Sequence, residues 1–78
     1  MLNKKQIVAA LRDDSTGTPG MIYESGEVNW GSGYVTERMM LRLQEAHIIA
    51  YHPLEHVYMR YDIVAAQNNE INRVLERR

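Results

Sequence analysis

The spacing of apolar side chains divides the chain into helical and extended segments. Residues 3–13 carry apolar side chains at helical spacing. Asn3, followed three residues later by Gln6, has the pattern of a capping box. Residues 36–47 have the same helical periodicity, and Thr36 stands where an N-cap is expected. These patterns predict two helices, of which the second is the clearer.

Two segments after the second helix have the character of strands. Residues 48–52 are rich in β-branched and aromatic side chains. Residues 56–61 alternate, which places Val57, Met59 and Tyr61 on one side of a half-buried strand. A short proline-containing break separates the segments. The pattern predicts an antiparallel hairpin.

The stretch between the two helices is less regular. Residues 14–20 are turn formers and predict a loop. Residues 21–30 hold two short apolar runs with Gly26 between them. This pattern fits either a two-stranded hairpin with Gly26 in its turn or an irregular segment with one strand, and both remain open.

The last segment, residues 62–77, is predicted to be one helix. Asp62 stands at its N-cap position, and Gln67 lies within its apolar face. Asn68 and Asn69 mark a point of weak helix propensity. This helix either closes the core of the monomer or pairs with its copy across a twofold axis. We favour a homodimer through residues 62–77.

Length and composition narrow the class of protein. With 78 residues and 45% apolar side chains, the chain fits a single folded domain, residues 1–78. Cysteine is absent, which excludes disulfides and thiolate zinc sites. No apolar stretch approaches the ~20 residues that span a bilayer, and no secretory signal is evident. We therefore expect a cytoplasmic α+β domain in the order helix, short strand or hairpin, helix, β-hairpin, helix.

Residues 36–61 resemble the second half of a winged-helix domain. In that family a recognition helix ends in a Leu-x-Glu-Ala-Gly-Ile-Ile junction and runs directly into a two-stranded wing. Residues 43–49 read Leu-Gln-Glu-Ala-His-Ile-Ile, so His47 replaces the glycine that adopts a left-handed conformation there. The glycines between residues 17 and 33 argue against the family's second helix. The resemblance implies a winged-helix-like fold over about a third of the chain.

The family's usual function is binding of double-stranded DNA, with the helix in the major groove and the wing on the backbone. Under that resemblance Arg38 and Arg42 would lie on the exposed face of helix 36–47, Arg60 on the second strand of wing 48–61, and Thr36 near a phosphate. Leu41 lies on the polar side of the same helix by its spacing, so another segment covers it or it is available to a partner.

The charge balance weighs against DNA as the first choice. The net charge is −1, whereas phosphate binding usually requires a basic excess. We therefore expect a small non-enzymatic interaction module, a protein-binding regulator or inhibitor, with a winged-helix DNA-binding regulator as the alternative. Its size and plain design resemble those of accessory proteins encoded by phages, which act on host machines, although no motif carries this likeness.

Three histidines raise the question of a metal site. His52 and His56 flank the hairpin turn with Glu55 between them, and His47 lies at the helix end. Two imidazoles and a carboxylate are suitable zinc ligands, but this spacing matches no recognised site and a fourth ligand is lacking. We expect exposed histidines, no metal, no cofactor and no catalytic group.

Overall fold

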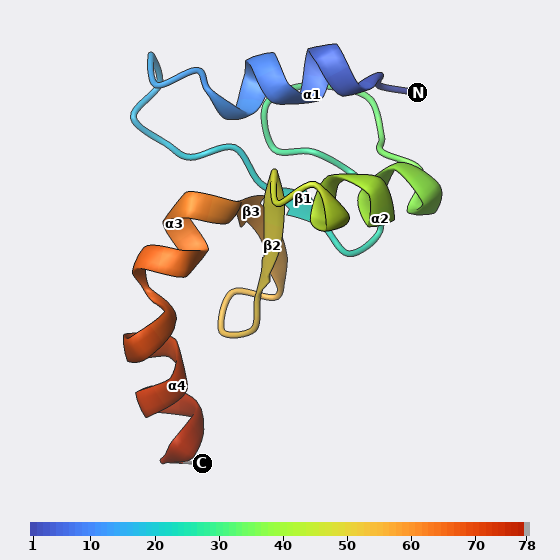
Figure 1. Cartoon of the computed structure of the whole chain (residues 1–78). Coiled ribbons are helices and arrows are strands. Elements are labelled where there is room, and N and C mark those ends of the chain that lie inside the picture. The colour runs from blue at the N-terminus through green and yellow to red at the C-terminus, as the bar shows by residue number, and fades with distance from the viewer. Residues whose placement is uncertain (78) are drawn as a thin grey trace.

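The computed structural model describes residues 1–77 and arranges them as four helices around a three-stranded antiparallel sheet (Figure 1). The elements in chain order are α1 (Lys4–Leu11), β1 (Ile22–Tyr23), α2 (Glu37–Glu45), β2 (Ile49–His52), β3 (Val57–Arg60), α3 (Tyr61–Ala66) and α4 (Asn68–Glu76). The predicted α+β class is confirmed.

Helix α1 begins with the capping box that the sequence predicts. The Asn3 side chain accepts a hydrogen bond from the Gln6 amide at 2.8 Å, and the Gln6 side chain accepts one from the Asn3 amide at 2.9 Å. Two amides that the first helical turn leaves without partners are satisfied in this way. Ile7 and Leu11 lie on the buried face of this helix.

The sheet has three strands, and not only the two of the predicted hairpin. β3 is central and pairs with β2 on one side and with the two-residue strand β1 on the other. A short strand within residues 21–30 was predicted, but its pairing with β3 was not, because the partner is more than thirty positions further along the chain, as Ile22 and Tyr58 illustrate.

Gly26 lies in a tight turn after β1, which favours the hairpin over the irregular segment. The Gly26 amide donates to the Tyr23 carbonyl at 2.8 Å, the Tyr23 amide donates to the Glu27 carbonyl at 2.8 Å, and Ile22 forms a bridge with Val28. The φ of Gly26 is +94°, and a Cβ there would lie 2.5 Å from the Val35 carbonyl oxygen. Only glycine satisfies both conditions.

Each face of the sheet is covered by its own hydrophobic cluster. The main cluster joins α1, α2 and the segment between them to one face, while the second joins α3 and α4 to the other. The buried members of the main cluster are Ile7, Leu11, Ile22, Val28, Val35, Met40, Leu43 and Ile49. The buried members of the second cluster are Val57, Met59, Val64 and Ile71. Between α1 and α2 the described residues form no helix, as their glycines predict.

The prediction of a single C-terminal helix is wrong, because the structure has two helices there, α3 and α4, separated at Gln67. α3 begins at Tyr61, so Asp62 lies in the first turn and is not the N-cap. Tyr61, predicted as the last inward residue of a strand, is helical and 38% exposed. The break coincides with a tertiary contact of the Gln67 side chain and precedes Asn68 and Asn69, whose helix propensity is low.

That contact involves His52, which is buried, contrary to the prediction of an exposed histidine. His52 is 4% exposed. Its Nδ1 accepts the Glu55 amide at 3.2 Å, and its Nε2 lies 3.0 Å from Oε1 of Gln67. Because a backbone amide only donates, Nδ1 is the acceptor and Nε2 carries the proton that Gln67 receives. The pair fixes the hairpin turn against the break between α3 and α4.

Candidate functional site

The junction between α2 and β2 sets the direction of both elements. The Ile48 amide donates to the Leu43 carbonyl at 2.9 Å and the His47 amide to the Gln44 carbonyl at 3.1 Å, which is the Schellman pattern of a helix C-terminus. His47 has a φ of +56°, so the left-handed conformation expected at this position is present. Its ring stacks on Tyr61, with centroids 4.6 Å apart. The stack ties the end of α2 to the start of α3.

Four of the five predicted site residues lie on or beside α2. Arg38, Leu41 and Arg42 are exposed, and Leu41 retains 56% of its accessible surface. Thr36 is the N-cap, and its hydroxyl oxygen accepts the Met39 amide at 3.2 Å. Thr36 therefore has a structural role in starting the helix.

Leu41 borders a hollow between α2 and the turn after β1. The hollow has a volume of about 660 Å³ and is lined by Glu24, Ser25, Gly26, Val35, Glu37, Arg38, Met40, Leu41, Gln44 and Tyr58. Its walls combine apolar side chains with two carboxylates and one guanidinium. An apolar surface with a mixed charged border is typical of the contact surface of a protein interface.

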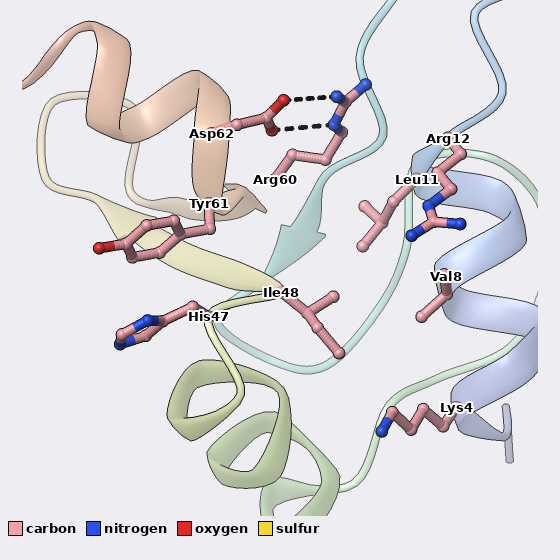
Figure 2. A pocket seen from close by; sticks show the side chains of 9 residues that line it. All are labelled: Lys4, Val8, Leu11, Arg12, His47, Ile48, Arg60, Tyr61 and Asp62. Carbon is pink, nitrogen blue, oxygen red and sulfur yellow. Dashed lines mark hydrogen bonds and ion pairs between the residues drawn. The ribbon is translucent and has the colours of Figure 1, made fainter.

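The fifth predicted residue, Arg60, lies elsewhere and its charge is already paired. Its guanidinium donates two hydrogen bonds to the Asp62 carboxylate, at 3.0 and 2.5 Å (Figure 2). It also lies 3.8 Å from Asp14. These hydrogen bonds from Arg60 lower the pKa of Asp62, and the carboxylate in turn raises the pKa of Arg60. Two acidic neighbours make Arg60 a poor phosphate ligand.

Arg60 borders a second groove that the sequence did not indicate. This groove has a volume of about 440 Å³ and lies between α1 and the α2–β2 junction (Figure 2). From α1 and its C-cap come Lys4, Val8 and Arg12, which face Ile48 on the opposite wall. The available signal was the spacing of four along α1, which places these three side chains on one face.

A smaller polar cluster joins the β1 turn to the hairpin. The Tyr51 hydroxyl donates to Oε1 of Glu24 at 2.6 Å and lies 3.2 Å from Nδ1 of His56. The hydrogen bond to Glu24 raises the pKa of Tyr51, because it stabilises the protonated phenol. Since its one proton goes to Glu24, the Tyr51 oxygen accepts from His56.

The histidines are dispersed over separate environments, with His47 on Tyr61, His52 on Gln67 and His56 on Tyr51. Within residues 1–77, no group of three His, Cys, Asp or Glu side chains is placed to hold a metal ion. None of the helices described is long and apolar enough to cross a membrane.

The structure thus brings Arg38 and Leu41 to one hollow and places Arg60 at another. Arg42 lies on the same helix as the first pair but lines neither depression. Comparison with protein-family models, with curated proteins and with solved structures finds no match to the chain.

Proposed function

We propose that the chain is a small non-enzymatic protein-binding module, a regulator or inhibitor that contacts its partner through the exposed face of α2. The observation that carries this proposal is the position of Leu41. It is 56% exposed on a helix whose other exposed side chains are polar, and it borders a hollow with further apolar walls. A single exposed leucine is common, but one beside a hollow with both apolar and charged walls offers a partner a shaped surface.

The energetics suit a binding function. Full burial of a leucine side chain contributes about 1.5–3 kcal/mol, so covering Leu41 would supply a sizeable part of the affinity of a small interface. Glu37, Arg38 and Glu45 surround it with both signs of charge. Mixed charges at the border of an interface fix its register and reject wrong partners more than they add affinity.

The groups that line the hollow are compatible with a regulatory role. The one hydroxyl nucleophile among its lining residues, Ser25, accepts a hydrogen bond from the Glu27 amide at 3.4 Å. The other polar lining groups are carboxylates, one guanidinium and one amide, apart from the Tyr58 phenol. A module of this kind acts on its partner by occupying a surface of it.

The test is affinity capture from host lysate with three baits. The baits are the wild type, Leu41→Glu and Ala9→Glu, which places the same charge at an exposed position of α1. The proposal expects a defined partner on the wild type and on Ala9→Glu, and its loss on Leu41→Glu. Equal capture by all three baits would remove Leu41 from the interface.

A second candidate function, DNA binding by a winged-helix-like arrangement, has support of its own. Arg38 and Arg42 are both exposed on α2, and no carboxylate among residues 1–77 forms an ion pair with either. α2 also turns directly into the β2–β3 hairpin. Such a helix would enter the major groove, with the hairpin as the wing.

This candidate is tested by fluorescence anisotropy with random-sequence duplex DNA at low salt. Binding that weakens steeply with salt and is reduced in Arg38→Ala and Arg42→Ala would favour it. Absence of a complex at low salt would eliminate it. The paired state of Arg60 predicts that Arg60→Ala has a smaller effect than either α2 variant.

A further inference from the structure

The second half of α4 carries an apolar stripe that the other described residues, 1–77, cover only in part. Ile71 is 4% exposed and packs in the second cluster, whereas Leu75, one turn later, is 37% exposed and Val74 is half-buried. Among residues 1–77, Val74 is not one of the partly buried side chains that pack against that cluster. Figure 1 shows the reason, because α4 extends away from the sheet toward the C-terminus and leaves its last turns beyond the core.

Charged side chains of both signs border this stripe on one flank of α4. Glu70 and Arg77 are seven residues apart, so they lie on the same flank of the helix, next to Val74. Both are exposed, and no described residue forms an ion pair with either. On the opposite flank, beside Leu75, lies the uncharged Asn72. One flank of α4 thus has an acid at its start and a base at its end.

We infer that α4 packs antiparallel against α4 of a second copy of this chain. When two helices pack antiparallel about a twofold axis, like flanks face each other and run in opposite directions. Glu70 of one copy then lies beside the second copy's Arg77, and the symmetry repeats the pair. A parallel arrangement would place the charged flank against the flank of Asn72, without this match.

The apolar contact of such a dimer is made by Val74 and Leu75 of both copies. These side chains lie on the side of α4 that continues from Ile71, so the second copy extends the existing cluster beyond the edge of the domain. The packing would cover the most exposed apolar group of α4, Leu75.

The length of α4 limits the strength of the dimer. Its nine residues span about 14 Å, and two such helices bury less than the ~1,200 Å² of a stable standard interface. We therefore expect a dissociation constant on the order of 0.1 mM. The dimer interface does not include α2, so a chain that stays monomeric would leave the proposed protein-binding function untouched.

The experiment is sedimentation equilibrium at protein concentrations up to about 1 mM, at low ionic strength so that exposed charges are weakly screened. The samples are the wild type, Glu70→Arg, Arg77→Glu, the double reversal, and an equimolar mixture of the two single variants. Both positions are exposed, and circular dichroism checks that every variant is folded.

The wild type should dimerise, and each single reversal should weaken self-association at least about tenfold, because like charges then face each other across the twofold axis. The double reversal and the mixture should associate as the wild type does, since both restore opposite charges. A wild type that stays monomeric at the highest concentration would overturn the inference. So would single variants that associate as tightly as the wild type.

Discussion

Substitutions of His47 test the α2–β2 junction, because its backbone conformation lowers the stability of the fold while its ring raises it. Its φ of +56° costs a residue with a Cβ about 1–2 kcal/mol relative to glycine. Its ring gains about 0.5–1.5 kcal/mol from the stack on Tyr61. His47→Ala keeps the backbone cost and loses the stack, so it should lower the free energy of unfolding by about 1 kcal/mol.

His47→Gly also loses the stack but removes the backbone cost. Glycine also has more conformational freedom in the unfolded chain, which lowers the free energy of unfolding by about 0.4–1 kcal/mol. The glycine variant should therefore be more stable than the alanine variant by roughly 0.5–1 kcal/mol, and close to the wild type. This ordering holds only if the residue is left-handed in the folded state.

Urea unfolding of the three proteins measures these differences, and a difference of 1 kcal/mol shifts the Tm of a chain of this length by about 4–8 °C. A double-mutant cycle with Tyr61→Leu isolates the stack, for which we expect a coupling energy of about 0.5–1.5 kcal/mol. An alanine variant as stable as the glycine variant would refute the left-handed junction. A coupling energy of zero would refute the stack.

Three further predictions concern other parts of the fold. Gly26→Ala should destabilise the chain by about 2 kcal/mol or more, because the new Cβ combines a positive φ with a close contact to backbone. Gln67→Ala should cost about 1–3 kcal/mol, because it leaves the buried Nε2–H of His52 without an acceptor; ¹⁵N NMR of the wild type should show the Nε2–H tautomer. Arg60→Gln should raise the pKa of Asp62 toward the ordinary value of an aspartate, as followed by NMR titration.

The Gly26 prediction has a matched control. Gly17 also has a positive φ, +71°, but nothing lies within 4 Å of its added Cβ, so Gly17→Ala should cost less than Gly26→Ala. The pKa of Asp62 is lower in the folded state than in the unfolded chain. The ion pair with Arg60 therefore stabilises the fold fully above the unfolded-state pKa of Asp62, and this stabilisation is lost as the pH falls through the folded-state pKa. Arg60→Gln should remove this acid-sensitive contribution, and an unchanged pKa of Asp62 would contradict the pairing.

Sequence reasoning succeeded where a structure is set by residues close together in the chain. The capping box of Asn3 and Gln6 and the left-handed His47 depend on positions within one helical turn, and both are present. The hairpin of β2 and β3 follows from a short break between two strand-like segments. The spacing of Leu41 placed it on the polar side of α2 and left open whether another segment covers it; it is exposed.

Most of the errors have non-local causes, whereas that at Arg60 has a local one. The pairing of β1 with β3 depends on a partner far along the chain, and the helix break coincides with a hydrogen bond between Gln67 and His52, which belongs to the hairpin turn. Arg60 was expected to be free for DNA, although a carboxylate two residues later, Asp62, was a readable signal of an ion pair. The periodicity of an element shows which face is buried but not which distant groups meet there.

The central claim, that this chain binds a protein through the face of α2 around Leu41, is tested most directly by site-specific photo-crosslinking. A photoreactive amino acid would replace Leu41 in one sample and Ala9, exposed on α1, in another. Irradiation in host extract should give one defined protein adduct from position 41 and none of that mass from position 9. A nucleic-acid adduct from position 41, or the same protein adducts from both positions, would contradict the claim.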